Sequence, residues 1–136
     1  MRPLGVGTDL VHIPGLRAQL ADVASVFAEM TFTDAERATA QQRPSRDPAR
    51  HLAARYAAKE AFIKAWSNMR LNKPPALHAL DMRDIEVIQD AHGRPALALH
   101  GAVAAAFQSD VNGTIQLSLS HDGDYALAFV VIGEML

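Results

Sequence analysis

The 136-residue chain contains no cysteine, only one tryptophan and only two tyrosines. Without cysteine there is neither a disulfide framework nor a zinc or iron–sulfur site with thiolate ligands. No apolar run approaches the roughly 20 residues of a membrane span. The first residues also lack the apolar core of a signal peptide. We therefore expect a soluble cytoplasmic protein that does not associate with a membrane.

Length and charge restrict the class further. A chain of this size is most simply one domain, residues 1–136, although oligomers of such small domains often bury additional apolar surface. The net charge of −2 and the scarcity of aromatic residues argue against nucleic acid as a partner. Residues 1–73 nevertheless carry 11 Lys/Arg against 7 Asp/Glu, and residues 74–136 carry 2 against 8. The basic half either faces an anionic ligand or an acidic partner, or is a solvated surface.

The segment from Asp47 to Trp66 is predicted to be the central helix. Asp47 can cap it, and Pro48 suits its first position, where the missing N–H costs nothing. Alanine, the best helix former, dominates its interior. At about 100° per residue, the bulky side chains fall on one broad face and the alanines cover most of the rest. A helix that is apolar nearly all round is expected to be buried.

Four ionisable residues interrupt this apolar helix, namely Arg55, Lys59, Glu60 and Lys64. Buried charge is unfavourable unless it is paired or bound to a ligand. Glu60 and Lys64 are four positions apart, so they share a face and are able to form a salt bridge. The helix by itself leaves two interpretations open: one structural salt bridge with snorkelling cationic stems, or a ligand site.

The N-terminal part is predicted to contain a strand followed by short helices. Residues 4–11 alternate like a strand, in which Gly5 and Gly7 permit close approach of another backbone. Asp9 interrupts the apolar end of this strand, where a turn or cap role is the simpler interpretation. A break at residues 12–15 precedes a predicted helix over residues 16–27. Thr33 and Glu36 have the spacing of a capping box, which predicts another helix start.

The C-terminal half favours strands. Their expected order is a hairpin of residues 85–90 and 95–100, an alanine-rich helix at 101–108, a strictly alternating strand at 114–121 and an apolar return strand at 125–132. Asp122 and Gly123 supply the last turn. The order of elements predicts an α+β domain with helices packed on an antiparallel sheet.

Three segments together resemble a known family. Residues 5–11 (GVGTDLV), residues 55–61 (RYAAKEA) followed by Lys64, and residues 117–121 (LSLSH) are similar to the motifs of the holo-(acyl carrier protein) synthases, the small phosphopantetheinyl transferases. The turn at residues 90–95 (Asp-x-x-Gly-x-Pro) is also similar to the family's. The resemblance covers nearly the whole chain in the family's order, and it implies a phosphopantetheinyl transferase-like fold.

The resemblance implies a reaction in fatty acid biosynthesis. A serine of an apo acyl carrier protein attacks the pyrophosphate of coenzyme A, phosphopantetheine is transferred, and adenosine 3′,5′-bisphosphate leaves. Asp9 and Glu60 are the implied Mg²⁺ ligands, which suits an ion that takes oxygen ligands and often only one or two carboxylates. Lys64 is placed to stabilise charge on the phosphates. Glu60, directly or through a metal-bound water, is also the candidate acceptor of the serine proton.

The implied coenzyme A contacts are less specific. Arg55 and Lys59 are candidates for phosphate or ribose contacts, and Ser120 is a further candidate. His121 is a candidate catalytic residue, with capping of the hairpin as its alternative. The Gly-Thr-Gly segment that many members carry after the central helix is missing here. Its contact would fall to Ser67, Asn68 or Arg70.

The implied partner is an apo carrier protein, either free or a domain of a large synthase. Many members carry an arginine for docking soon after the first motif, where this chain has Pro14 and Gly15. The candidate docking residues here are Arg17, Arg43, Arg46 and Arg50. The resemblance also implies a homotrimer with active sites at subunit interfaces. The alternatives are a Mg²⁺-dependent hydrolase of the coenzyme A pyrophosphate and a non-catalytic module that binds coenzyme A or a carrier.

Overall fold

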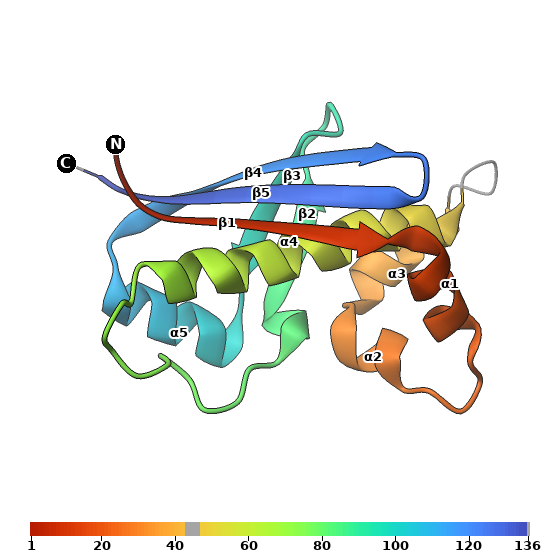
Figure 1. Ribbon diagram of the computed structural model, residues 1–136, viewed down its shortest axis with the longest axis horizontal. Coiled ribbons are helices and arrows are strands. Elements are labelled where there is room, and N and C mark those ends of the chain that lie inside the picture. The colour runs from red at the N-terminus through yellow and green to blue at the C-terminus, as the bar shows by residue number, and fades with distance from the viewer. Residues whose placement is uncertain (43–46, 136) are drawn as a thin grey trace.

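The computed structural model describes residues 1–42 and 47–135 (Figure 1). Its elements in order are β1 (Arg2–His12), α1 (Ile13–Ala21), α2 (Phe27–Thr31), α3 (Asp34–Gln41), α4 (Pro48–Asn68), the 3₁₀ turn η1 (Met82–Asp84), β2 (Ile85–Gln89), β3 (Pro95–Leu99), α5 (Gly101–Asp110), β4 (Gly113–Asp122) and β5 (Tyr125–Glu134). Helices pack on antiparallel strands, so the predicted α+β class is confirmed. Within the described residues no helix is long and apolar enough to cross a membrane.

The main sheet has three antiparallel strands in the order β1-β5-β4, and β2 and β3 form a separate hairpin. Figure 1 shows α4 running along one face of the main sheet, with α1 and α2 at one end and α5 at the other. Gly5 and Gly7 make this contact close, because a Cβ at either position would overlap a carbonyl oxygen of Ala65 or Ala61. The prediction that these glycines admit another backbone is therefore confirmed.

The face of the sheet that packs on α4 is apolar in β4, as the alternation predicted. Ile115, Leu117 and Leu119 are half-buried, whereas the serines and the glutamine between them are exposed. On β5 the corresponding inward residues are fully buried, for example Val130 and Ile132. Burial of such side chains contributes about 1.5–3 kcal/mol each, so this layer stabilises the fold substantially.

The predicted helix over residues 16–27 is wrong, because α1 ends at Ala21 and α2 begins only at Phe27. The helix α1 begins at Ile13, capped by His12, whose Nδ1 accepts from the Gly15 N–H at 3.3 Å. It ends at Ala21. The Asp22 carboxylate then accepts from the Ala24 N–H, and the Ser25 hydroxyl accepts from the Phe27 N–H. These local side-chain bonds compete with the helical ladder and turn the chain before α2.

The other predicted caps are present. Thr33 and Glu36 form the reciprocal capping box at the start of α3. Asp47 accepts from the Ala49 N–H at 3.0 Å, and Pro48 opens α4, as expected. This helix ends at Asn68 and buries twelve residues, including two that carry charge, Arg55 and Lys59. The prediction of a buried central helix is therefore confirmed.

Candidate active site

The C-terminal end of β1 and the middle of α4 form one wall each of a cleft of about 330 Å³, which α1 closes. Asp9 lies in this cleft because it shares the inward face of β1 with Gly5 and Gly7, four and two positions before it. Glu60 reaches the same cleft from the exposed edge of α4. Two carboxylates that are 51 positions apart in the sequence therefore meet in one place.

Lys64 binds the first of these carboxylates. Its Nζ donates to Asp9 Oδ1 at 2.8 Å and to the carbonyl oxygen of Thr8 at 3.1 Å. A structural salt bridge between Glu60 and Lys64 was one of the two interpretations that the helix left open, and the described residues show no such ion pair. The strand β1 offers Lys64 two acceptors at once, the carboxylate of Asp9 and the carbonyl oxygen of Thr8, and Glu60 has a different partner. The structure thus brings together the three residues Asp9, Glu60 and Lys64.

The partner of Glu60 is Tyr56, one helical turn earlier, a residue that was not among the candidates predicted from the sequence. Burial raises the pKa of the Tyr56 phenol, and the negative charge of Glu60, the hydrogen bond to it and the charge of Asp9 raise it further. The phenol therefore stays protonated and donates to the Glu60 carboxylate. The ring packs edge-on against Phe27, with centroids 5.5 Å apart. The i, i+4 spacing of Tyr56 and Glu60 was the signal available in the sequence.

The donor set of this cleft fits Mg²⁺. The ion takes oxygen ligands, keeps several waters and commonly binds only one or two protein carboxylates together with substrate phosphates. Asp9 uses one oxygen for Lys64, which leaves the other oxygen available, and Glu60 lies in the same cleft. Among the described residues no cluster of three or more carboxylate or histidine side chains forms a fuller cage. An ion held here by the chain alone would keep open positions for water and phosphate.

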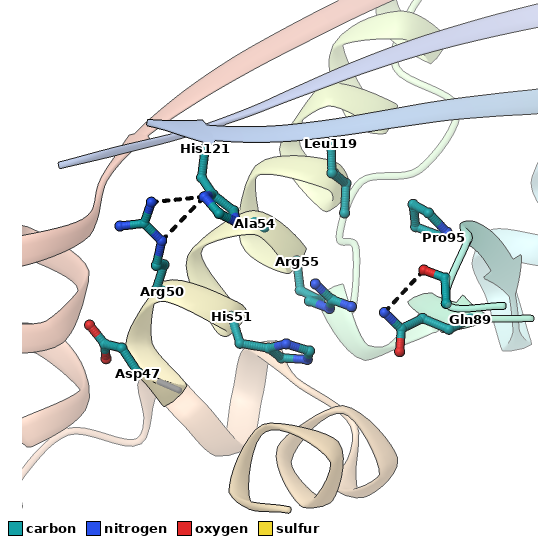
Figure 2. Close-up of a pocket in the computed structure, with 10 residues that line it drawn as sticks. Asp47, Arg50, His51, Ala54, Arg55, Gln89, Pro95, Leu119 and His121 are labelled. Atoms are coloured by element: carbon teal, nitrogen blue, oxygen red, sulfur yellow. Dashed lines mark hydrogen bonds between the residues drawn. The ribbon is translucent and has the colours of Figure 1, made fainter. Parts of the chain in front are cut away.

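A second cleft, of about 510 Å³, lies between the start of α4, the tip of the β2–β3 hairpin and the end of β4 (Figure 2). Arg50 crosses it to His121, donating to Nδ1 from Nε at 3.2 Å and from Nη2 at 2.8 Å. A guanidinium only donates, so Nδ1 is the acceptor and the neutral ring carries its proton on Nε2. Arg50 also donates to the carbonyl oxygen of Gly123 at 3.0 Å. His121 is thereby fixed beside the β4–β5 turn.

Arg55 and Lys59 have different surroundings, although they are one turn apart. Arg55 is buried and lines the second cleft, where Figure 2 shows its side chain directed toward Gln89. Lys59 is fully buried in the core, and its Nζ donates to Glu36 Oε1 at 2.8 Å and to the carbonyl oxygens of Met82 and Ile85 at 3.0 and 2.6 Å. All three of its protons are used. The structure therefore corrects the expectation that Lys59 contacts coenzyme A and assigns it to packing α4 on α3 and β2.

The three candidates for the missing glycine-rich segment also separate. Asn68 accepts from the Val6 N–H at 3.2 Å, so it is bound to the edge of β1. Arg70 donates to Asp110 at 2.5 Å and to the carbonyl oxygen of Pro74, which fixes the loop after α4. Ser67 is exposed, and it lies seven positions after Glu60 on the same helical face. Of the three, only Ser67 remains suited to a ligand contact.

Ser120 does not lie with Arg55 and His121. It belongs to the outward-facing positions of β4 and is paired across the ladder with Leu127, whose side chain is exposed. His121, the next residue, faces inward and lines the second cleft. The expected contact of Ser120 with coenzyme A is therefore not supported within a single chain.

Two of the four candidate docking arginines are described, and both have intramolecular partners. Arg17 forms an ion pair with Asp47, the residue that caps α4. Arg50 is bound to His121 and Gly123. Arg43 and Arg46 lie outside the described residues. Arg17 is half exposed and stands on α1, next to the cleft that contains Asp9 and Glu60.

Comparison with known proteins identifies the family. Residues 5–130 match the model of the 4′-phosphopantetheinyl transferase superfamily. Relatives named holo-[acyl-carrier-protein] synthase from Mycobacterium sp. (strain KMS) and Mycobacterium tuberculosis (strain ATCC 25618 / H37Rv) are each 50% identical to the chain, over 134 and 129 residues. The alignments cover 98% and 95% of this chain, and 99% and 95% of the two relatives.

Solved structures of acyl carrier protein synthases have the same fold as this chain. One described as the "Chronobacterium ammoniagenes ACPS-CoA complex" superimposes with a TM-score of 0.88 at 46% identity, covering 97% of this chain and 98% of that chain. The acyl carrier protein synthase of Mycobacterium tuberculosis gives a TM-score of 0.77 at 42% identity, covering 98% and 99%. The fold is thus that of a phosphopantetheinyl transferase.

The chain belongs to the 4′-phosphopantetheinyl transferase superfamily, among the holo-(acyl carrier protein) synthases. The family, the fold and the enzyme class predicted from the three short motifs are therefore confirmed.

Proposed function

We propose that the chain transfers 4′-phosphopantetheine from coenzyme A to a serine of an apo acyl carrier protein or carrier domain, and so supplies holo carrier for fatty acid synthesis. The observation that carries this proposal is that Asp9 and Glu60 line one cleft and that Lys64 binds Asp9. Two carboxylates and one cation suit a reaction in which a pyrophosphate is bound and broken. Coenzyme A is also present in the solved complex of the Chronobacterium ammoniagenes relative.

In the reaction, the serine oxygen of the carrier attacks the phosphorus that bears the pantetheine arm. A new P–O bond forms, the P–O bond to the adenosine 3′,5′-bisphosphate breaks, and the leaving group takes its electron pair. Lys64 lies beside the phosphates and stabilises the charge that develops on them. Glu60 receives the serine proton, directly or through a water. Tyr56 holds the Glu60 carboxylate in place by its hydrogen bond.

Mg²⁺ would be held by Asp9 and Glu60, where it would neutralise phosphate charge and orient the displacement. Loss of the hydrogen bond from Lys64 to Asp9 is not needed, since a carboxylate accepts at two oxygens. The rest of the coordination sphere would come from phosphate oxygens and water.

The nucleotide end of coenzyme A is assigned to the second cleft, with Arg55 and His121 as contacts. The two clefts share no lining residue. One lies beside β1 and the other beside β4, at opposite edges of the sheet. We propose that a coenzyme bound at Asp9 and Glu60 reaches the second cleft of another copy of the chain, whose Arg55 and His121 would complete the site.

The outer face of the main sheet supports such an assembly. Its exposed apolar side chains are Val6 and Leu10 on β1, and Tyr125, Leu127 and Phe129 on β5. Cross-strand pairing places Leu10 beside Leu127, and Val6 beside Val131, so the residues form one continuous patch. Large exposed apolar patches mark interaction sites. We assign this patch to the interface of a homotrimer with active sites between subunits.

The deciding experiment incubates the chain with coenzyme A and an apo carrier, with and without Mg²⁺, and weighs the carrier by mass spectrometry. The proposal expects a Mg²⁺-dependent gain of one phosphopantetheine and release of adenosine 3′,5′-bisphosphate. Cleavage of coenzyme A without any change in the carrier would identify a hydrolase instead. Binding without cleavage would identify a non-catalytic module. Light scattering that reports a monomer at assay concentration would overturn the trimer.

A further inference from the structure

His12 lines the cleft that contains Asp9 and Glu60, and the reaction proposed above gives it no role. It is the last residue of β1 and stands directly before α1, the helix that closes this cleft (Figure 1). Its side chain is exposed, so a substrate in the cleft can reach it.

Two contacts fix the imidazole of His12. Its Nδ1 accepts from the Gly15 N–H at 3.3 Å, in the first turn of α1. Its ring also lies against Tyr125, the cross-strand partner of His12 on β5, with centroids 5.4 Å apart and planes tilted by 50°. A Cβ at Gly15 would lie 3.3 Å from Nδ1, so the missing side chain there leaves room for the ring. The imidazole is thus held between α1 and β5 before any substrate binds.

The bond to Gly15 also decides what this imidazole offers to a ligand. Because Nδ1 accepts, the neutral ring carries its proton on Nε2. Within residues 1–42 and 47–135, Nε2 donates to no acceptor. In this state the ring donates from Nε2 and cannot take a proton there, so it does not compete with Glu60 for the serine proton. It supplies one fixed hydrogen-bond donor.

A phosphoryl group in this cleft needs such donors, because it would lie between two carboxylates. The phenol proton of Tyr56 is used by Glu60. The ammonium of Lys64 uses two of its three protons on β1, one of them on Asp9. The donors already described therefore leave most of the acceptor oxygens of a phosphoryl group unmatched.

His12 and Gln19 both line the cleft from the side of α1, and both carry an N–H group. Gln19 is exposed, and in the described part of the chain no hydrogen bond holds its amide. The ring of His12 is held by two contacts. A donor that is oriented in advance stabilises developing charge without first losing reorganisation energy. His12 is therefore the stronger candidate of the two.

From these contacts we propose that His12 is a further catalytic residue, whose Nε2–H donates to a non-bridging oxygen of the phosphoryl group that is transferred. The inference rests on the proposed function, because the phosphoryl group must be bound at Asp9 and Glu60 for His12 to reach it. The hydrogen bond strengthens as charge develops on that oxygen, and His12 transfers no proton itself. A hydrogen bond to a charged group is worth roughly 10- to 100-fold in rate.

Two substitutions separate this role from the capping of α1. Asparagine caps helices well and keeps an acceptor near the position of Nδ1, but it does not extend to the position of Nε2. Glutamine carries an amide N–H to that position and is not a favoured cap. His12→Asn should therefore keep the melting temperature of wild type and lower kcat about 10- to 100-fold. His12→Gln should lower the melting temperature by a few degrees and keep kcat within about threefold.

The steady-state constants identify what Nε2 contacts. In His12→Asn the KM for the carrier should stay within about twofold, because the lost bond is to the phosphoryl group. A rise in that KM with kcat unchanged would mean that Nε2 meets the carrier, and would overturn the proposal. A loss of kcat in His12→Gln but not in His12→Asn would make His12 only a cap, with the same consequence. His78→Ala is the control, because it removes an exposed imidazole that lines neither cleft.

A long-range ¹H–¹⁵N spectrum of the imidazole rings tests the contact without turnover. The signal of His12 is the one that disappears in His12→Gln. Addition of coenzyme A and Mg²⁺ without any carrier should shift its Nε2 resonance and leave that of His78 in place. A His12 resonance that moves only when apo carrier is added would overturn the proposal. Failure of wild type to modify the carrier would overturn the proposed function instead, and the spectrum would still decide whether His12 contacts the pyrophosphate.

Discussion

The ammonium of Lys64 lies 2.8 Å from Oδ1 of Asp9, across the contact between α4 and β1. Lys64 therefore pairs with Asp9 on β1, and not with Glu60 on its own helix. Lys64 is half exposed, so the pair contributes little to stability, about 0–1 kcal/mol. In the proposed reaction the same cation contacts the reacting phosphates, where an electrostatic contact is worth far more.

Lys64→Met should therefore separate activity from stability. We expect kcat to fall about 10²–10³-fold, the range found when one preorganised electrostatic donor is removed. The free energy of unfolding should change by less than about 1 kcal/mol. Arg83→Met is the control, because it removes a cation from another exposed ion pair, with Asp81, away from the cleft. Denaturant unfolding and carrier mass assays of both variants provide the measurements. Comparable kcat values in the two variants would contradict the role of Lys64.

Lys59 should show the opposite pattern, because its ammonium is fully buried and bound to Glu36. Lys59→Met leaves the Glu36 carboxylate buried without its cation, which should cost about 3–5 kcal/mol. Adding Glu36→Gln should recover part of this loss, since no uncompensated charge then remains. The KM for coenzyme A should stay within about twofold in whichever of these variants folds. A large rise in KM with little loss of stability would restore Lys59 as a coenzyme contact.

Tyr56 offers a spectroscopic test of the cleft. Burial, the charge and hydrogen bond of Glu60 and the charge of Asp9 all raise the pKa of its phenol. A Glu60→Gln change removes the negative charge of Glu60, so the pKa of Tyr56 should fall. Tyrosinate absorbance can follow this, because Tyr125 is the only other tyrosine and Tyr56→Phe identifies its signal. An unchanged titration in Glu60→Gln would show that Glu60 and Tyr56 are not in contact.

The local chemistry of the sequence was enough to predict the frame of the site. The cap at Asp47 and the alanines predicted the buried helix α4, and Gly5 and Gly7 predicted a strand that another backbone approaches closely. The fates of Lys59 and Lys64 were not predictable in this way. Both are cations in one apolar helix. Lys59 has a structural role because Glu36 and the carbonyl groups of Met82 and Ile85 accept hydrogen bonds from its ammonium in the folded chain.

The remaining discrepancies have one local cause and one tertiary cause. The side chains of Asp22 and Ser25 divided the expected helix over residues 16–27, although the apolar pattern continued through them. Arg70 was a candidate ligand contact by sequence position, and its position opposite Asp110 made it the anchor of a loop.

The stability that Asp110 contributes through its hydrogen bonds should depend on pH. The hydrogen bond from Arg70 is the largest cause that lowers the pKa of the Asp110 carboxyl, and the Trp66 indole N–H lowers it further. A carboxyl whose pKa is lower in the folded state contributes stability above its unfolded value, about 3.9, and loses it as the pH falls through the folded value. The unfolding free energy of wild type should therefore decline below about pH 4 more than that of Asp110→Asn. Parallel pH profiles of the two proteins would contradict this coupling.

The sharpest prediction concerns Asp9 and Glu60 together. If they hold one Mg²⁺, Asp9→Asn and Glu60→Gln each remove a ligand of the same ion. Their effects on kcat should then be strongly non-additive. Each single change should remove most of the metal-dependent rate and weaken Mg²⁺ binding, and the double change should add little. Titration calorimetry with Mg²⁺ and carrier mass assays on the three variants provide the two readouts.

The stability of these variants separates a shared metal from two independent roles. Both carboxylates lie in one cleft and repel each other in the metal-free protein, so removing either one should not lower the melting temperature by much. Asp9→Asn also weakens the ion pair with Lys64, which offsets part of that gain. Glu60→Gln keeps a carbonyl oxygen that can accept from the Tyr56 phenol, so its offset is smaller, and it should be the more stable of the two without Mg²⁺. Additive losses of kcat together with unchanged Mg²⁺ affinity would mean that the two carboxylates act separately, and that the ion is bound by the substrate phosphates alone.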